Sequence, residues 1–439
     1  MHAHPTIAFA TLGCRTNQAE TAQLVASLAE VCAVVPFGEP ADVSVINTCT
    51  VTHEAHRQSR QLVRRAHRAN PAGRLVVTGC AVDLDPAGFE ALPGVSLVAR
   101  NAEKHAIAEA VAAWFGERSP AWRPVTPEES GHTRAFLKVS EGCNNRCSFC
   151  IVPMVRGSEQ GVPMEVLVER AIALSRLGYQ EIVLTGTHIG GYGRAFGASL
   201  ATLLKRLLTE VPEVPRWRIA SIEPLDFPDD LVALMAEPRV CPHVHLCLQS
   251  GSTRILNAMR RRYTADRYRS LVERIRTTRP DVAVTTDVIV GFPGETEADF
   301  AETLAMIAEV RFAGVHLFPF SVRAGTHAEG LPDRIPSAIV GERMEQAQAI
   351  ARTTQNAWQD GFIGRRIEVL TERASAEWRP ATSAHGLRVL VPAGETSPNQ
   401  LLTLRIERGS DGALFGAAIP RRSGGSTGDG QGLEPIGLG

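Results

Sequence analysis

The sequence predicts an α/β protein in three parts: an N-terminal parallel α/β domain, a central partial (β/α)6 barrel and a small C-terminal β-barrel. Apolar, β-branched runs alternate with helical stretches over most of the chain, which is typical of parallel sheets covered by helices. A proline-rich stretch at residues 119–131 interrupts this alternation and predicts a linker. After about residue 365 the helical periodicity fades, and short β-rich runs replace it.

The N-terminal domain is predicted to span residues 1–118. Each of its predicted strands is followed by a helical stretch, which favours parallel pairing. In a parallel sheet the carboxyl ends of all strands share one edge, and ligands commonly bind there. The strands are expected at residues 6–12, 43–47 and 75–78, and helices at 18–30 and 54–69.

The central domain, residues 132–360, contains six βα units in succession, which predict an open or partial barrel. In such barrels the chemistry takes place at the carboxyl ends of the strands. The strands are expected at residues 136–139, 182–185, 217–221, 244–248, 284–290 and 315–318. Helices are expected between them at 164–177, 200–210, 267–277 and 297–310.

The C-terminal part, residues 365–422, is predicted to form a small β-barrel. Its β-rich runs lie at residues 367–371, 387–391 and 401–406, between turns that contain Gly, Pro and Ser. Arginines outnumber acidic residues in this part, so it is mildly basic. The Gly/Ser-rich tail, residues 423–439, is predicted to be disordered.

Composition narrows the function classes. The formal net charge of the 439 residues is −1, so any nucleic-acid surface must be a local patch. We find neither a signal peptide nor an apolar run near the roughly 20 residues that a membrane helix needs, so we expect a cytoplasmic monomer without a membrane partner. Cysteines in that compartment stay reduced, so clusters of them indicate metal ligands or catalytic thiols.

Cys143, Cys147 and Cys150 form a C-x3-C-x2-C set directly after the first predicted barrel strand. Iron–sulfur clusters need several thiolates that a short loop brings together. Three cysteines would leave one iron of a four-iron cluster free to bind another ligand. The alternative is an incomplete zinc site, but zinc takes four protein ligands in structural sites and no fourth ligand follows nearby.

Cys14, Cys49 and Cys80 form a second set, since each closely follows a predicted strand of the N-terminal domain. We expect these thiols to converge at one sheet edge and to hold a second cluster. Coincidental burial is the alternative on spacing alone. The other three cysteines are interpreted as core residues, namely Cys32, Cys241 and Cys247.

One arginine-rich helix face could bind phosphate, because arginines recur there at steps of three and four. A second run of arginines stands beside Tyr263, which could stack on a base or simply pack. For both groups a solvated surface is the alternative. The candidates are Arg57, Arg60, Arg64, Arg65 and Arg68 in the helix and Arg260, Arg261 and Arg262 in the run.

The two cysteine sets and several short motifs resemble the methylthiotransferase family of radical S-adenosylmethionine (SAM) enzymes. The motifs lie at residues 13–18 (Gly-Cys-Arg-Thr-Asn-Gln), 47–52, 78–81, 140–145, 248–252 and 291–295, and together they cover nearly the whole chain before the tail. The last segment resembles a TRAM domain, a small barrel that contacts the substrate. The resemblance implies two 4Fe-4S clusters, SAM, a low-potential electron donor and a radical reaction that needs no acid–base side chain.

Within the family, residues 47–52, 59–65, 186–194 and 259–264 resemble the MtaB subfamily. That resemblance implies methylthiolation at C2 of N6-threonylcarbamoyladenosine, 3′ to the anticodon in the transfer RNA (tRNA) anticodon loop. Sister subfamilies act on N6-isopentenyladenosine in tRNA or on an aspartate of a ribosomal protein, and the basic barrel argues against the ribosomal substrate. A non-catalytic iron–sulfur carrier or RNA-binding scaffold, which would lack a SAM pocket, is a further alternative.

The resemblance also implies contacts to SAM. Phe149 occupies the position where family members carry an aromatic residue beside the adenine of SAM. Polar residues and glycines at the ends of four later strands are candidates by position, and loop capping or a tight turn is the alternative for each. They are Gly186, Thr187, Ser221, Glu223, Gln249, Ser250, Asp287 and Gly291.

Overall fold

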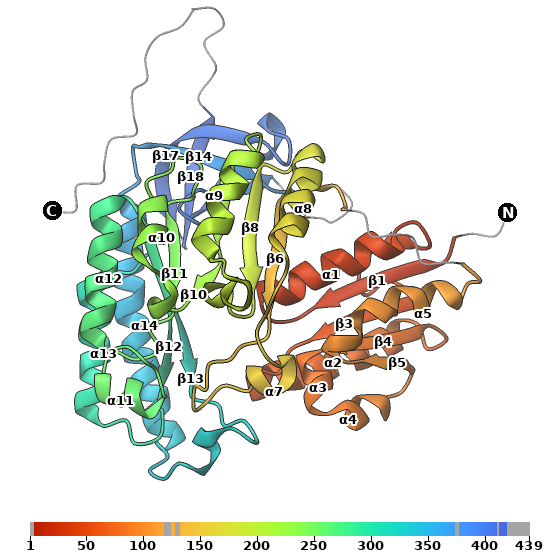
Figure 1. Cartoon of the computed structure of the whole chain (residues 1–439), viewed down its shortest axis with the longest axis horizontal. Coiled ribbons are helices and arrows are strands. Elements are labelled where there is room, and N and C mark those ends of the chain that lie inside the picture. The colour runs from red at the N-terminus through yellow and green to blue at the C-terminus, as the bar shows by residue number, and fades with distance from the viewer. Residues whose placement is uncertain (1–3, 118–123, 128–131, 374–376, 411, 419–439) are drawn as a thin grey trace, which may run out of the picture.

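The computed structural model describes residues 4–117, 124–127, 132–373, 377–410 and 412–418. The predicted tail and most of the predicted linker lie outside these residues. A parallel α/β unit lies beside a central set of parallel strands, and a small β-barrel caps one end of that set (Figure 1). This arrangement confirms the predicted fold class. No helix in the described part of the chain is both long and apolar enough to cross a membrane.

The N-terminal sheet is entirely parallel, with the strand order β2-β1-β3-β4-β5. Its core lies on both faces: Leu24 and Val111 pack from α1 and α5 on one side, and Val63 and Phe89 from α2 and α4 on the other. The strands are β1 (Thr6–Thr11), β2 (Ala33–Val35), β3 (Val43–Thr48), β4 (Arg74–Gly79) and β5 (Val95–Ala99). The helices are α1 (Arg15–Leu28), α2 (His53–Ala69), α3 (Cys80–Leu84), α4 (Pro86–Glu90) and α5 (Ile107–Ala113).

The six predicted strands of the central part are all present and parallel, in two hydrogen-bonded groups that meet at Ala220. The strands are β6 (Arg134–Glu141), β8 (Glu181–Gly186), β9 (Arg216–Ile219) with β10 (Ser221–Ile222), β11 (His243–Leu246), β12 (Ala283–Val290) and β13 (Gly314–Pro319). A short antiparallel strand, β7 (Gln160–Gly161), pairs with the end of β6. The described strands therefore form a partial barrel that is open between β6 and β13.

Helices cover the outside of this partial barrel because each presents an apolar stripe to the strands. In α9, for example, Leu203, Leu204 and Leu207 are fully buried, and the Ser199 hydroxyl caps the first turn by accepting from the Thr202 N–H. The helices of the central part are α7 (Val152–Arg156), α8 (Met164–Arg176), α9 (Leu200–Glu210), α10 (Asp229–Leu234), α11 (Thr253–Ala258), α12 (Ala265–Thr278), α13 (Glu297–Val310) and α14 (Ser337–Asp360). Of these, α7 packs against α3 of the N-terminal unit (Figure 1).

The C-terminal part is a closed barrel with the order β14-β15-β16-β18-β17. Its strands are β14 (Arg366–Thr371), β15 (Trp378–Ser383), β16 (Arg388–Pro392), β17 (Leu401–Ser410) and β18 (Ala413–Ala418). The sequence did not predict β15 and β18, because Pro380 interrupts the first and Ala and Gly dominate the second. Arg216 and Arg218 reach from β9 to Glu368 and to the Ser383 carbonyl, so hydrogen bonds dock the barrel on the central strands.

Candidate functional site

The structure places Cys14, Cys49 and Cys80 at one edge of the N-terminal sheet. Cys14 is the N-cap of α1 after β1, Cys49 follows β3, and Cys80 begins α3 directly after β4. Since β1, β3 and β4 are neighbouring parallel strands, their carboxyl ends meet. Gly13, at φ +91°, lies so close to Cys49 that an added Cβ would be 2.7 Å from its Sγ. Only glycine allows the loop to approach this thiol so closely.

These N-terminal thiols are close enough to affect one another's ionisation. Burial, with smaller contributions from nearby Cys80 and Cys14, raises the pKa of Cys49 to about 11. Burial also raises the pKa of Cys80, although the charge of Arg156 opposes this. The Arg156 Nε donates to the Cys80 Sγ at 3.1 Å. The positive charge of Arg156 can therefore offset negative charge on the Cys80 thiolate at this edge.

Arg156 itself comes from α7, just after the central cysteine set, and it is held by two acidic side chains. Its Nη1 donates to Glu20 Oε1 at 2.8 Å and to Glu141 Oε1 at 2.7 Å. Burial would raise the pKa of Glu20, but the charges of Lys104, Arg156 and Lys138 hold it well below its usual value. The sequence analysis missed this buried network because nothing in local spacing connects its members.

The central set, Cys143, Cys147 and Cys150, lies on the loop that follows β6. Gly142, at φ +70°, starts this loop, and an added Cβ would be 2.0 Å from the Ser158 carbonyl oxygen. The Cys143 N–H donates to the Gly157 carbonyl at 3.1 Å and holds the loop closed. Burial raises the pKa of Cys143 to about 11 and that of Cys150 to about 12. These thiols therefore also need a cation or metal to ionise at neutral pH.

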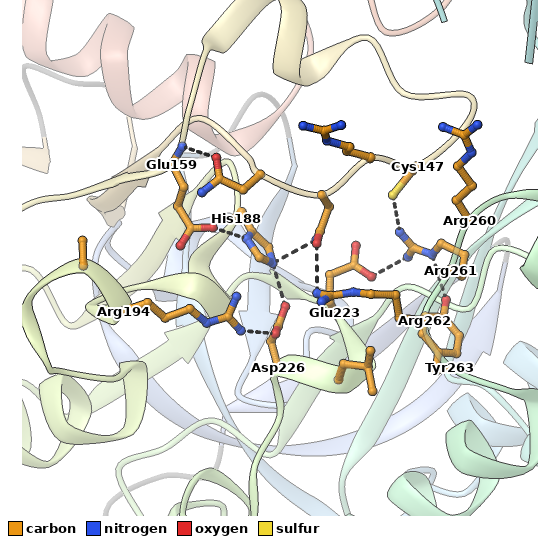
Figure 2. Close-up of a pocket in the computed structure, with 15 residues that line it drawn as sticks. Cys147, Glu159, His188, Arg194, Glu223, Asp226, Arg260, Arg261, Arg262 and Tyr263 are labelled. Carbon is orange, nitrogen blue, oxygen red and sulfur yellow. Dashed lines mark hydrogen bonds and ion pairs between the residues drawn. The ribbon is translucent and has the colours of Figure 1, made fainter. Parts of the chain in front are cut away.

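A second buried arginine, Arg261, contacts the central set. The Arg261 Nη1 donates to the Cys147 Sγ at 3.2 Å, and its Nη2 forms an ion pair with Glu223 at 2.5 Å. Its Nε donates to the Tyr263 hydroxyl oxygen at 3.2 Å. Figure 2 shows this guanidinium between Cys147 and Glu223, on the wall of a pocket. Each cysteine set thus has one buried arginine that hydrogen-bonds a sulfur.

The spacing of the thiols favours a cluster over a single ion. All nine cysteines are free. Around one tetrahedral zinc ion, ligand sulfurs would lie about 3.8 Å apart, given a Zn–S distance of about 2.3 Å. Among the described residues, neither cysteine set brings its three sulfurs within 4.8 Å of one another, whereas His245, Cys247 and Asp287 do come that close. Wider sets of thiols suit a polynuclear iron–sulfur cluster.

Two cavities border the central set. One cavity, of about 670 Å³, is lined by Cys147, Glu223 and His188 (Figure 2). His188 Nδ1 is 2.6 Å from Glu159 Oε2, and its Nε2 is 2.6 Å from Asp226 Oδ2. Burial would lower the pKa of His188, but these two acids raise it. The other cavity, of about 270 Å³, is lined by Thr52 after the N-terminal set and by Cys150 of the central set. It therefore lies beside Cys150 and the segment that follows Cys49.

The predicted SAM residues lie in different surroundings. Phe149, Gln249 and Asp287 line the 270 Å³ cavity, and Glu223 lines the 670 Å³ pocket. Ser250 is fully buried, with its hydroxyl 3.3 Å from that of Thr303. The remaining candidates make local contacts or are exposed: Gly186 against Ser140, Thr187 bonded to Glu141, exposed Ser221, and Gly291 bonded to Glu295. Their roles in binding stay predictions.

The predicted RNA-binding arginines also separate into groups. On α2, Arg57 pairs with Glu54, and Arg60 pairs with Asp85. Arg65 lies over the Phe37 ring, with its guanidinium carbon 5.9 Å from the ring centroid. Arg64 and Arg68 are exposed, and neither has a hydrogen-bond or ion-pair partner in the described part of the chain. All three arginines of the second run line the 670 Å³ pocket, and Arg261 also donates to Cys147.

Comparisons with known proteins agree with this site. Residues 137–307 match the radical SAM superfamily, and residues 6–99 match the uncharacterized protein family UPF0004. The chain is 37% identical over 387 residues to the threonylcarbamoyladenosine tRNA methylthiotransferase MtaB of Bacillus subtilis (strain 168), which covers 85% of this chain and 86% of that protein. It is 37% identical over 394 residues to a tRNA-2-methylthio-N(6)-dimethylallyladenosine synthase of Parafrankia sp. (strain EAN1pec), over 85% of this chain and 79% of that protein.

A solved structure shares the fold alone. The radical SAM methyltransferase TsrM from Kitasatospora setae superimposes with a TM-score of 0.55 at 14% sequence identity. The match covers 72% of this chain and 75% of that one. At this identity the likeness supports the arrangement of strands and helices and carries no information about substrate.

Proposed function

Because this chain belongs to the methylthiotransferase family of radical SAM enzymes, we propose that it attaches a methylthio group to C2 of N6-threonylcarbamoyladenosine in tRNA. The observation that carries the proposal is that the two cysteine sets adjoin, with a cavity beside them that is lined by Cys150 and by Thr52, which follows the N-terminal set in the chain. A base that enters this cavity would lie beside Cys150 and the segment that follows Cys49. Cys80 also packs against Ile151 and Val155, directly after the central loop, so the two sets adjoin.

The substrate follows from the relatives. Proteins named for threonylcarbamoyladenosine from several bacteria are 35–37% identical over most of the chain. We propose that the target lies in the anticodon loop, next to the anticodon, where an unpaired base leaves its stack at little energetic expense. The second candidate is dimethylallyladenosine, that is isopentenyladenosine, because synthases with that name are also 35–37% identical.

The cofactors are SAM and two 4Fe-4S clusters, which when bound supply the sulfur, the methyl group and the radical that removes hydrogen from C2. We propose that Cys143, Cys147 and Cys150 hold the cluster that binds SAM. In the same scheme Cys14, Cys49 and Cys80 hold the auxiliary cluster. The wide spacing of the thiols in each set supports this assignment. Iron–thiolate bonding would overcome the raised thiol pKa values that burial produces.

The chain's own residues position and shield these groups. Arg156 and Arg261 would offset thiolate charge, since each donates to a cysteine sulfur. We propose that Phe149, Gln249 and Asp287, which line the cavity beside Cys150, contact SAM there. Glu223 accepts from Arg261 and would fix the polar end of SAM in the larger pocket. The apolar walls of the smaller cavity, such as Ile289 and Phe318, would exclude water from the radical.

We further propose a separate role for each of the three parts of the chain. Residues 1–118 would carry the auxiliary cluster, residues 132–360 the SAM cluster, and residues 365–422 a substrate-binding barrel like a TRAM domain. A low-potential electron donor would reduce the SAM cluster, and the enzyme would act as a monomer. The pairing of Arg216 with Glu368 across the barrel junction supports a fixed position of the barrel relative to the site.

The test uses anaerobically reconstituted, reduced protein with SAM and anticodon stem-loop RNAs. One RNA carries threonylcarbamoyladenosine, a second isopentenyladenosine and a third unmodified adenosine. Mass spectrometry of the digested nucleosides should show the methylthio product mainly from the first RNA. Product mainly from the second RNA would transfer the function to the isopentenyl substrate. Cleavage of SAM without any methylthio nucleoside would refute the proposed function.

A further inference from the structure

The 670 Å³ pocket beside Cys147 has more cations than its own acids can neutralise. Five arginines and three acids line it. The acids are paired within the pocket: Glu223 with Arg261, Glu159 with His188, and Asp226 with His188 and Arg194. The other three arginines, Arg146, Arg260 and Arg262, have no acidic partner in the described part of the chain.

These three arginines are exposed. Arg262 Nη2 donates to the neutral Asn145 Oδ1 at 3.2 Å, so its charge stays uncompensated. In Figure 2 the Arg194 and Arg262 side chains extend toward the centre of the pocket from opposite sides, and Arg260 lies at its edge. Several exposed guanidinium groups around one hollow attract an anionic partner.

The backbone at Arg260 points to a role outside its own turn. Arg260 and Arg261 end α11, where their N–H groups donate to the Asn257 and Leu256 carbonyls. Arg260 adopts φ +57° there, a conformation for which glycine is the usual residue in helix ends of this kind. The turn itself does not favour an arginine, and strained positions of this sort often mark functional sites.

The pocket also gives a short path to the central cysteine set. Arg146 directly precedes Cys147 in the chain. From the other side of the pocket, Arg261 Nη1 donates to the Cys147 Sγ at 3.2 Å. Electron tunnelling is fastest over short covalent and hydrogen-bonded paths. A carrier seated on this pocket would therefore be well placed to pass an electron to the central set.

The origin of the lining residues favours an electron donor over the RNA substrate. Among the described residues, those that line this pocket all lie between 144 and 263, in the central unit. The 270 Å³ cavity, by contrast, also contains Val51 and Thr52 of the N-terminal unit. A base that receives the methylthio group must reach both cysteine sets, whereas a donor needs only the central one. Phe196, 46% exposed next to the lining residue Ala195, adds an aromatic contact of the kind that protein interfaces combine with arginine.

We propose that the 670 Å³ pocket is the docking surface for the low-potential electron donor, and that this donor is a small electron-transfer protein with an acidic surface. The inference rests on the proposed function, because it requires the SAM cluster at the central set. The donor loses one electron and the central cluster gains it, and no bond forms or breaks between the two proteins. Arg146, Arg260 and Arg262 contact acidic side chains of the donor and steer its approach. Redox encounters of this kind bury little surface, so the donor can leave after each transfer.

The experiment measures binding of two acidic low-potential carriers, a flavodoxin and a ferredoxin, to the reconstituted enzyme at several salt concentrations. Arg260→Gln and Arg262→Gln should each raise the Kd of the bound carrier by about two- to fivefold, the usual worth of an exposed ion pair. The triple variant with Arg146→Gln should raise it about tenfold or more, mainly through slower association, and the effect should shrink at high salt. Arg352→Gln is the matched control, because Arg352 is an exposed arginine of α14 outside the pocket lining. It should leave the Kd unchanged.

Two further measurements separate a docking role from other roles. SAM cleavage by the triple variant should fall much more with the protein carrier than with dithionite, a small reductant that needs no docking surface. Hydrogen exchange of the wild-type enzyme should show that the carrier protects residues 144–147 and 259–263. This exchange measurement locates the donor even if the triple variant fails to take up iron.

The outcomes distinguish this inference from the proposed function. Binding of neither carrier, protection only at other segments, or an equal loss with dithionite would overturn the docking surface. A loss of tRNA affinity in the triple variant as large as its loss of carrier affinity would assign the pocket to RNA instead. Absence of any methylthio nucleoside from the wild-type reaction would reject the proposed function, while carrier binding and SAM cleavage would still report on the pocket.

Discussion

The two cysteine sets reach a similar chemical arrangement by different structural routes. The central set lies on one loop after β6, so its three thiols are close in sequence. The N-terminal set is collected from the ends of three adjacent strands, β1, β3 and β4. Each set has a buried arginine bonded to one sulfur, Arg261 in the first case and Arg156 in the second. Only Arg261 belongs to the unit whose cysteines it contacts.

This difference shows which unit depends on the other. Arg156 belongs to the central unit but donates a hydrogen bond to Cys80 of the N-terminal set, and buried acids such as Glu20 hold it in place. In the described part of the chain, no side chain of the N-terminal unit donates a hydrogen bond to a sulfur of the central set. We therefore expect the N-terminal site to be sensitive to the junction between the units. The central site should tolerate damage at that junction.

The largest effects should come from removing each set in turn. Replacing Cys143, Cys147 and Cys150 with Ala should abolish SAM cleavage and product formation. Replacing Cys14, Cys49 and Cys80 should abolish the methylthio product but leave SAM cleavage. Each triple variant should contain about four irons per chain where the wild type holds about eight. Iron analysis and quantification of 5′-deoxyadenosine test this directly, and an unchanged iron content in either variant would remove the distinction between the sets.

The next largest effect concerns the two arginines. Arg156→Met leaves Glu20 and Glu141 without one of their cations, and breaking a buried ion pair in this way destabilises by roughly 3–5 kcal/mol. Lys104 and Lys138 remain on Glu20 and should limit the loss to the lower end of that range. We expect a lower melting temperature and a selective loss of the auxiliary cluster, visible by electron paramagnetic resonance.

Arg261→Met is the matched control for that variant. It removes the donor to Cys147 and the partner of Glu223 within the central unit. We expect it to perturb the SAM cluster and to leave the auxiliary cluster loaded. Equal losses from both sites in either variant would contradict the proposed dependence of one unit on the other.

The sequence predicted the two sites unequally for a physical reason. Spacing alone identified the central set, and the rule that parallel strand ends share an edge identified Cys14, Cys49 and Cys80. Neither could identify Arg156, because its partner Glu20 is 136 positions away and both are single charges within helices.

A smaller effect should distinguish the sites by pH. The buried acid near the N-terminal set, Glu20, faces lysines and an arginine, whereas His188 stands between Glu159 and Asp226 near the central set. These acids raise the pKa of His188 above 6.5, so its stabilisation is complete below pH 6.5 and is lost as the pH rises through the raised pKa. Because the depressed pKa of Glu20 lies well below 4.5, its contribution does not change in that range.

The measurement is the melting temperature of wild type and His188→Gln between pH 6 and pH 9. Their difference should be largest at pH 6 and should shrink toward pH 9. Glu20→Gln should lower the melting temperature by the same amount across this range. A pH-independent difference for His188→Gln would show that the histidine acts only by packing.

The smallest effect concerns RNA affinity, where arginines near both sets are candidates. On α2, which begins just after the N-terminal set, Arg64 and Arg68 are exposed and unpaired among the described residues, whereas Arg57 is already neutralised by Glu54. A phosphate contact releases counterions, so the loss of one phosphate contact weakens binding more at low salt. It also lowers the slope of log affinity against log salt concentration by about one.

Arg64→Gln and Arg68→Gln should each weaken tRNA binding a few-fold and flatten its salt dependence, while Arg57→Gln should change both less. Binding titrations at several salt concentrations measure this, and matching losses in all three variants would mean that α2 contributes only diffuse charge. Arg262→Gln beside the central set extends the comparison, because a larger loss there would assign the main RNA contact to the central unit.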